Sequence, residues 1–293
     1  MVVKNQEWAI VTPTYHLDFE QFKLMCESMD HFVHGTWHHY VVVSKADYTL
    51  FAPFNNDRRT VVENTKILPK WLRYIGKLGP IRSGNFWFSW RTGPLFGWHI
   101  QQLVKLSMAN FVKEEAILIV DSDLFFIQPF KLNTLIKDGR LPFLRSPTDY
   151  SGRQEPAPVF IDQAKKTLKL PATTPSFDYA NNIVVWHRQT VIDLCNYIEM
   201  LHGKHWIAAL SGLHAISEGS LYGLYVDHIS KSDNTYVAEH FQLAKTVHGD
   251  FAIHGEELAN FASELLPHHV ALGFQSSARF DIVELRQTYQ KFI

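Results

Sequence analysis

Apolar runs alternate with helix-like patterns along the first half of the chain. The runs at 8–12, 39–44, 60–63 and 116–121 predict buried strands, because they lack the polar–apolar alternation of a strand with one face in water. Apolar residues spaced three and four positions apart predict helices over 17–29 and 97–112.

The second half of the chain shows a similar mixture. It predicts strands at 182–186 and 268–274, and helices over 158–169, 188–202, 217–226 and 281–291. Strands and helices in this succession favour an α/β fold with a central, mostly parallel sheet flanked by helices. No break in composition marks a second domain, so we expect a single domain over residues 1–293.

The segment 71–95 interrupts this pattern. It is rich in Trp, Gly, Arg and Pro and shows no steady period. A long irregular segment inside a compact domain is typical of a functional loop or of a lid over a site.

Composition narrows the class of protein. The chain is 46% hydrophobic, enough for a large core, and its net charge of −1 gives no basic face for nucleic acid. Cys26 and Cys195 form neither a CxxC motif nor a disulfide framework, which fits a reducing cytoplasm. The first residues lack the apolar stretch of a signal peptide or a membrane span. We expect a cytoplasmic protein without a transmembrane segment, and peripheral contact with a membrane stays open.

Two carboxylates one residue apart, Asp121 and Asp123, end the fourth apolar run. Buried carboxylates are costly and repel each other, so a positive charge is expected beside them. The pair could simply cap a turn. A phosphatase of the haloacid-dehalogenase type is disfavoured, because Phe125 stands where that motif has Thr or Val. The remaining interpretation is a site for Mg²⁺ or Mn²⁺ that bridges the carboxylates to a nucleotide diphosphate.

The block LVKLSMANFVKEEAILIVDSDLFF favours this metal site. It resembles the corresponding block of glycosyltransferases of the GT-A fold, especially the glycogenin and galactosyltransferase-like family, with Lys105 placed 16 residues before Asp121. The resemblance implies a single GT-A (Rossmann-like) domain with a nucleotide-binding half at 1–126 and an acceptor-binding half at 127–293. It also implies Mn²⁺ or Mg²⁺ on Asp121 and Asp123, and a catalytic donor contact from Lys105.

Further donor contacts are expected beside the ends of the predicted strands. These candidates are Thr12, Thr14, Tyr15, Ser44, Asp47, Ser122, Gln275 and Ser276. In the GT-A fold the residues after the first strand hold the base and ribose, so Tyr15 is placed to stack on the base. For Ser44 and Asp47 a helix cap is an equally good interpretation.

Acceptor and catalytic candidates come from the second half and from segment 71–95. The stretch FDYANNIVVWHRQTV resembles the acceptor-side strand of the family and makes Asn182 a candidate, although the family's glycine is missing. The stretch SEGSLYGLYV resembles a segment with a catalytic acid, supplied here by Glu218, which alternatively pairs with a helix dipole. Trp87 and Trp90 are candidates to stack on an acceptor sugar, or else core residues.

The third metal ligand stays open, because the family's motif His-x-x-Gly-x-x-Lys-Pro-Trp is absent. The histidines that could replace it are His248, His254, His268 and His269.

The implied function is transfer of a sugar from a nucleotide-sugar donor to a carbohydrate or a lipid-linked glycan. The chain also resembles uncharacterised bacterial glycosyltransferase-like proteins encoded with surface polysaccharide genes. Two alternatives remain. A nucleotidyltransferase that forms sugar nucleotides normally has a Gly-rich loop after the first strand, and TPTYHLD has none. A non-catalytic carbohydrate-binding protein with a relict site stays open.

Overall fold

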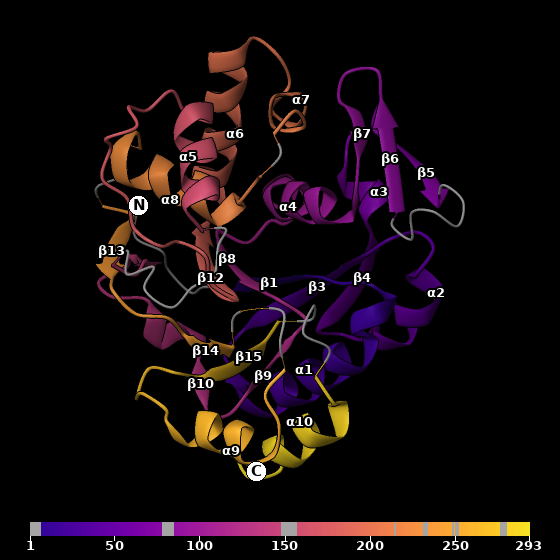
Figure 1. Cartoon of the computed structure of the whole chain (residues 1–293), viewed down its shortest axis with the longest axis vertical. Helices are drawn as coiled ribbons and strands as arrows, with labels where there is room; N and C mark the ends of the chain where they lie inside the picture. The colour runs from indigo at the N-terminus through magenta and orange to yellow at the C-terminus, as the bar shows by residue number, and fades with distance from the viewer. Residues whose placement is uncertain are drawn as a thin grey trace.

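A five-stranded sheet forms the centre of the molecule (Figure 1). The computed structural model describes residues 7–77, 85–147, 157–213, 215–230, 234–247, 249, 252–275 and 280–293. The strands follow the spatial order β12 (Ile183–His187), β8 (Ala116–Val120), β1 (Trp8–Pro13), β3 (Trp37–Val43) and β4 (Arg59–Glu63). Neighbours run parallel except β12, which is antiparallel to β8. The expected α/β class with a mostly parallel main sheet is confirmed.

Both faces of this sheet are covered, which explains the uninterrupted apolar runs. Along β1, Trp8 and Ile10 belong to one core, whereas Ala9 and Val11 belong to a second core on the other face. The residues of β8 divide between the two cores in the same alternating way. A strand buried on both faces has no polar side, so its sequence shows no alternation.

Helices cover both faces of the sheet and contribute side chains to the two cores. They are α1 (Phe19–Phe32), α2 (Tyr48–Phe51), α3 (Asn64–Ile67), α4 (Gly97–Ser107), α5 (Ala157–Thr167), α6 (Arg188–His202), α7 (Trp206–Leu210), α8 (Glu218–His228), α9 (Gly255–Ser263) and α10 (Ile282–Tyr289). Helices α1, α9 and α10 pack into the first core, and α4, α6 and α8 into the second. No helix in the described part of the chain is long and apolar enough to span a membrane.

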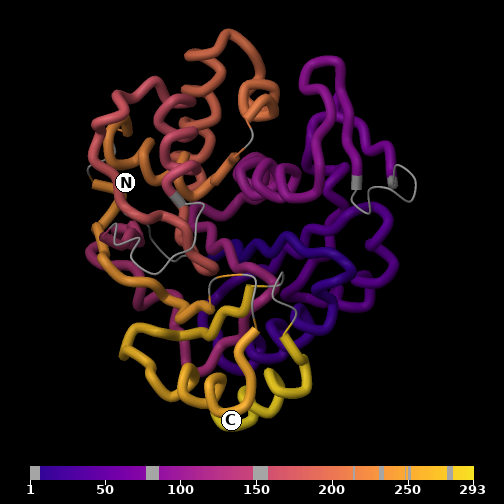
Figure 2. The backbone as a smooth tube through the Cα atoms, in the orientation of Figure 1, coloured from indigo at the N-terminus to yellow at the C-terminus, as the bar shows by residue number. Residues whose placement is uncertain are grey.

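Segments far apart in the sequence close the first core. Figure 2 shows the last helix, α10, beside α1. Arg286 of α10 donates to Glu27 of α1 at 3.0 Å. The C-terminal residues therefore belong to the same packed unit as the first strands.

Smaller sheets extend the central one. β15 (Ala271–Phe274) lies between β14 (Ala244–Val247) and β9 (Leu124–Phe126), and β9 begins directly after Asp123. Two pairs complete this part: β2 (Val33–His34) with β10 (Phe130–Lys131), and β11 (Leu141–Leu144) with β13 (Tyr236–Glu239). One strand of the sheet β14–β15–β9 therefore begins immediately after Asp123, a predicted metal ligand.

Segment 71–95 contains a three-stranded antiparallel sheet where an irregular loop was expected. Its strands are β5 (Arg73–Lys77), β6 (Asn85–Ser89) and β7 (Gly93–Leu95), and residues 78–84 lie outside the described structure. The prediction of irregular structure is wrong for the described residues. Because Phe86, Trp87 and Phe88 follow one another in β6, both faces of the strand carry aromatic rings and the alternation disappears.

Two glycines let α8 approach Tyr179 closely. A Cβ atom built on Gly223 would lie 2.1 Å from the Tyr179 ring, and one on Gly219 would lie 2.8 Å from the Tyr179 carbonyl oxygen. Tyr179 is buried, so its ring has little freedom to move aside. This packing sets the position of the first turn of α8, where Glu218 lies.

We expect Gly223→Ala to lower the free energy of unfolding by about 1–3 kcal/mol, because the added methyl group overpacks the contact with Tyr179. Denaturation in urea measures the change. Gly212→Ala is the matched control: nothing lies within 4 Å of its added Cβ, so its stability should stay within about 0.5 kcal/mol of wild type. Equal stability of the two variants would contradict the packing argument.

Candidate active site

The predicted polar residues lie at one edge of the central sheet. β1, β3 and β8 run parallel and end at Pro13, Val43 and Val120. Thr14, Ser44 and Asp121 follow these ends directly. Because carboxyl ends of parallel strands meet at the same edge, the sheet brings these segments together, in the position where α/β proteins bind ligands.

Lys105 connects two carboxylates at this edge. Its Nζ lies 2.9 Å from Asp121 Oδ1 and 2.9 Å from Glu218 Oε1. Lys105 and Glu218 are buried, and the Asp121 side chain remains 30% exposed. The structure therefore supplies the positive charge that the sequence pattern required beside the aspartates.

The charges of Lys105, Asp121 and Glu218 influence one another's protonation. Burial alone would lower the pKa of Lys105, but the carboxylates of Asp121 and Glu218 outweigh burial and raise it. Burial raises the pKa of Asp121, Lys105 opposes that rise, and Glu218 adds to it. With both carboxylates ionised, the three groups carry a net charge of −1, and the Asp123 carboxylate lies close by in sequence.

Helix α4 positions Glu218 through a second contact. Gln102 Oε1 accepts a hydrogen bond from the Glu218 backbone N–H at 3.3 Å, one helical turn before Lys105. Ser217 caps α8 by accepting from the Ser220 N–H at 3.1 Å. The i, i+3 pair on α4 therefore holds both the backbone and the carboxylate of Glu218.

Asn182 braces both aspartates. Its backbone carbonyl accepts from the Asp121 N–H at 3.0 Å, and its Nδ2 donates to Asp123 Oδ1 at 3.3 Å. Thr246 of β14 donates to Asn182 Oδ1 at 2.8 Å, which fixes the orientation of the amide. The acceptor role predicted for Asn182 stays a prediction, and its observed contacts are with the predicted metal ligands.

Ser122 and Gln275 also lie beside the aspartates. The Ser122 hydroxyl donates to Asp18 Oδ2 at 3.2 Å, and both residues are buried. The Phe274 N–H donates to the Asp123 carbonyl at 2.7 Å, which brings the next residue, Gln275, close to Asp123. Gln275 Oε1 accepts from the Gly249 N–H at 3.0 Å. Ser276, the other predicted diphosphate contact, lies outside the described residues.

A small pocket of about 50 Å³, lined by apolar and polar side chains, opens at the ends of β1 and β3, next to α3 and α4. Thr14 Oγ1 and Asn64 Oδ1 are buried on residues that line it, and within the described structure neither has a hydrogen-bond partner. An unpaired buried polar atom costs about 1–3 kcal/mol, so a molecule with polar groups would be stabilised here. Ser44 also lines the pocket.

The other predicted donor residues have partners within the protein. Ser44 donates to Asp47 Oδ2 at 2.9 Å and accepts from the Asp47 N–H at 3.2 Å, and Asp47 Oδ1 lies 3.1 Å from His16 Nδ1. This mutual pairing closes the turn before α2, whose N-cap residue Asp47 makes no side-chain cap hydrogen bond. Tyr15 lies half-buried beside His16, with ring centroids 5.7 Å apart.

Thr12 belongs to a buried chain of hydrogen bonds. Its Oγ1 lies 3.0 Å from His39 Nε2, and Arg59 Nε donates to His39 Nδ1 at 2.8 Å. Because Nδ1 accepts, the ring proton resides on Nε2, which donates to Thr12. Arg59 in turn forms an ion pair with Asp30 at 2.8 Å. The Thr12 side chain therefore stabilises the seam between β1 and β3.

The two predicted acceptor tryptophans have opposite environments. Trp87 is only 1% exposed, belongs to the second core and lines the small pocket. A buried ring offers no free face to a sugar, so its burial argues against the stacking role predicted for Trp87. Trp90 is 95% exposed at the connection between β6 and β7.

The candidate third metal ligands lie elsewhere or outside the described residues. His248 is outside them. His254 pairs with Glu284 at 2.8 Å on the far helices α9 and α10. His268 and His269 precede β15, whereas Asp123 contacts the other end of that strand. None of the three described histidines is in contact with the aspartates in this structure.

The donor atoms fit an ion that arrives with its substrate. Asp121 and Asp123 offer the hard oxygen ligands that Mg²⁺ and Mn²⁺ prefer. Among the described residues, no group of three or more His, Cys, Asp or Glu side chains could hold a metal by itself. Mg²⁺ is commonly held by one or two carboxylates together with water and substrate phosphates, which this pair could provide.

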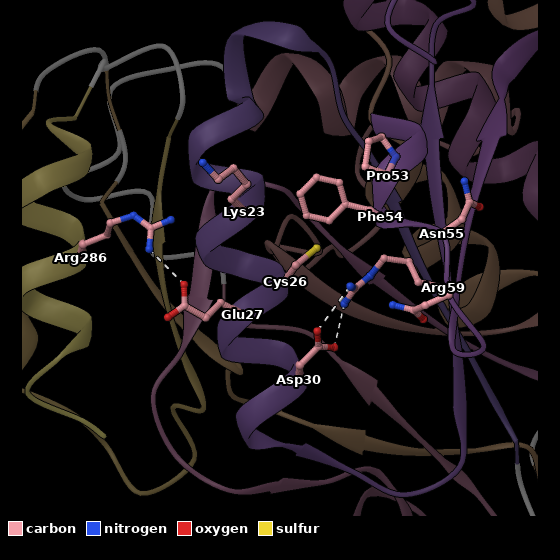
Figure 3. Close-up of a pocket in the computed structure, with 10 residues that line it drawn as sticks. Lys23, Cys26, Glu27, Asp30, Pro53, Phe54, Asn55, Arg59 and Arg286 are labelled. Atoms are coloured by element: carbon pink, nitrogen blue, oxygen red, sulfur yellow. Dashed lines mark hydrogen bonds and ion pairs between the residues drawn. The ribbon is translucent and has the colours of Figure 1, made fainter. Parts of the chain in front are cut away.

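A larger groove of about 450 Å³ lies away from this site (Figure 3). It is lined by residues of α1, the β4 region and Arg286 of α10, and it contains none of the predicted site residues. Its charged side chains pair with one another, Arg59 with Asp30 and Arg286 with Glu27. We therefore place the candidate active site at the sheet edge.

Comparison with protein families gives a match over most of the chain. Residues 9–286 match a protein family described as "Family of unknown function (DUF6492)". The chain belongs to this family. The matched range includes Lys105, Asp121, Asp123, Asn182 and Glu218, so the candidate site lies within the part of the chain that the family covers. No curated protein matches the chain.

Lys105→Met should destabilise the protein at neutral pH by an amount near the lower end of ~3–5 kcal/mol, because it leaves two carboxylates without their ammonium. In wild type the raised pKa of Lys105 keeps its contribution present until the pH rises above about 10.4. In the variant burial still raises the pKa of Asp121 and Lys105 no longer opposes that rise, so the stability of the variant falls as the pH rises from about 4.

Urea denaturation at pH 5 and pH 8 tests this, and the gap between wild type and variant should be wider at pH 8. Lys23→Met is the control, because Lys23 pairs with Glu20 on the surface and should contribute less than about 1 kcal/mol. A gap independent of pH would mean that the loss arises from packing and not from charge.

Proposed function

We propose that this protein is a metal-dependent glycosyltransferase of the GT-A fold. It would transfer a sugar from a nucleotide diphosphate donor to a hydroxyl of a carbohydrate or a lipid-linked glycan. The observation that supports this most directly is the cluster in which Lys105 joins Asp121 and Glu218 beside Asp123, at the carboxyl edge of a mostly parallel sheet. Residues from three distant parts of the sequence meet there, as the resemblance implies.

The arrangement of the strands supports the same proposal. Strands β4, β3, β1 and β8 run parallel, and antiparallel β12 lies next to β8, which carries the aspartates at its end. The small pocket at the ends of β1 and β3 lies where a nucleoside would be expected, and Thr14, Ser44 and Asn64 are among the residues that line it.

Asp121 and Asp123 would hold Mg²⁺ or Mn²⁺ together with the donor diphosphate. Bound there, the ion would supply positive charge against the charge of the leaving diphosphate. Asn182 keeps Asp123 oriented through its amide. Lys105 would place its ammonium close to the donor, where its charge adds to the stabilisation of the leaving group.

Transfer requires the acceptor hydroxyl to attack the anomeric carbon of the sugar while the bond to the diphosphate oxygen breaks. The hydroxyl proton has two possible destinations. In an inverting reaction Glu218 takes it as general base. In a retaining reaction the leaving phosphate takes it, and Glu218 positions Lys105 through their 2.9 Å contact.

Thermal unfolding with Mn²⁺ and a panel of nucleotide diphosphates and their sugars tests the donor site. One nucleotide together with Mn²⁺ should raise the melting temperature by on the order of 5 °C at 100 times its Kd, and neither component should do so alone. Asp123→Asn should abolish the shift.

Asp138→Asn is the control, because Asp138 is an exposed carboxylate in the turn before β11 and should leave the shift unchanged. No shift in wild type with any nucleotide would overturn the proposed donor site. A nucleotidyltransferase would bind a nucleoside triphosphate with a sugar phosphate in place of the nucleotide sugar, so both belong in the panel.

Glu218→Gln should slow hydrolysis of the identified donor, or transfer to an acceptor, by at least roughly 10²-fold if Glu218 is the general base. Release of the nucleotide diphosphate measures the rate. The substitution keeps the size of the side chain, and donor binding by the thermal assay serves as the folding and binding control. A loss below about tenfold would leave Glu218 only a positioning role through Lys105.

A further inference from the structure

The sheet of β5, β6 and β7 has an unusual outer face. Its inner face is conventional: Tyr74, Trp87 and Leu95 stand opposite one another across the three strands and pack on the second core. An antiparallel sheet with one face on the core normally shows polar side chains on the other face. On the outer face of this sheet, large apolar side chains stand beside the polar ones.

Aromatic and apolar side chains continue on the outer face. Arg73, Phe88 and Pro94 stand opposite one another in the register of the three strands. Trp90 follows two residues after Phe88, and the two rings lie 5.4 Å apart in an edge-to-face contact. Phe88 is half-buried and Pro94 is exposed.

The most exposed aromatic ring lies at the tip of this sheet. The Thr92 N–H donates to the Ser89 carbonyl at 3.1 Å and closes a turn that holds Trp90 and Arg91. Trp90 is 95% exposed, and Ile75, in the irregular part of β5, is 52% exposed. The three strands project from the body of the molecule at the upper right of Figure 1. Large apolar side chains held in water on a projecting element indicate an interaction surface.

The charge along the stretch of sequence that contains this sheet is one-sided, with one of its cations, Lys105, buried in the candidate site and another, Lys66, paired with Glu63. Residues 64–113 contain eight of the 28 Lys and Arg residues of the chain and none of its 29 Asp and Glu residues. Arg73 and Arg91 are exposed on the projecting sheet itself. The remainder of the chain is correspondingly acidic, so the near-zero net charge conceals a basic region and an acidic one.

We propose that the outer face of β5–β6–β7 docks on an anionic lipid surface. Trp90 and Ile75 would enter the interface between headgroups and acyl chains, where Trp is favoured, while Arg73 and Arg91 contact the lipid phosphates. Positive charge on an apolar tip complements an anionic membrane more directly than it complements a neutral glycan. This proposal does not rest on the glycosyltransferase function.

Flotation with lipid vesicles tests the proposal. The full chain is mixed with vesicles of phosphatidylcholine alone or with roughly one third phosphatidylglycerol, a level that gives an anionic surface. Wild type should bind the anionic vesicles and lose binding at high salt. Trp90→Ser should weaken binding roughly tenfold or more, because it removes the large apolar side chain that would be buried in the membrane interface.

Charge and apolar area are separated by two further variants. Arg73→Gln combined with Arg91→Gln should weaken binding to anionic vesicles by about tenfold or more, at about 1 kcal/mol for each residue near the surface. Met200→Ser is the control, because Met200 is also an exposed apolar residue, 69% exposed on α6, but lies off the projecting sheet. Its binding should equal that of wild type.

Three results would overturn the proposal. The first is that wild type fails to bind anionic vesicles. The second is binding that Trp90→Ser and Met200→Ser leave equally strong. The third is that Trp90→Ser abolishes a different interaction of a wild type that does not bind vesicles. If wild type binds a neutral oligosaccharide and the variant does not, the face is a carbohydrate surface. If wild type forms a dimer in sedimentation velocity and the variant does not, the face is a self-association surface. Unchanged melting temperatures show that the variants are folded.

Discussion

The sharing of one ammonium by two carboxylates is the constraint on which this molecule's candidate site depends. Lys105 lies on α4, Asp121 follows β8, and Glu218 begins α8, so one cation joins two neighbouring elements to a third that is about 100 residues away in sequence. Without it, two anions would lie in a largely buried place and repel each other. The surrounding contacts serve the same arrangement: Gln102 holds the start of α8, and Asn182 holds both aspartates.

The charged residues of this cluster could be predicted from the sequence, but the residues that hold them in place could not. Asp121, Asp123 and Lys105 could be found because a strand end and a fixed spacing are local features of the chain. Asp18, Gln102 and Thr246 were missed, because their partners are about 60 to more than 100 residues away and no local pattern records such contacts. Asn64 was missed for a different reason: a buried oxygen without a partner is visible only once its surroundings are known.

For the fold, too, local features of the sequence could be predicted, whereas pairings between distant segments could not. Strands buried on both faces were recognisable as continuous apolar runs, and α6 was predicted with the bounds it has. The segment 71–95 was misjudged because β6 carries aromatic rings on both faces, so the period of two that reveals a half-exposed strand is absent. The short strands that pair with β15 were not predicted either, because their hydrogen-bonding partners lie far along the chain.

The candidate site and the projecting sheet are connected by the covalent chain. β7 ends at Leu95 and α4 begins at Gly97, so the helix that carries Gln102 and Lys105 follows the aromatic sheet after a single residue. A contact made by the outer face would therefore act on an element whose other end holds the carboxylates. The basic region and the acidic edge meet along α4.

The hydrogen-bonded chain from Asp30 to Thr12 has a consequence for proton chemistry. Burial, together with the neighbouring Arg59, holds the pKa of His39 well below its ordinary value, so the imidazole stays neutral and keeps one tautomer. His39 therefore neither stores nor releases a proton when the solution moves through the neutral range. The seam between β1 and β3 therefore keeps the same hydrogen bonds on either side of neutral pH.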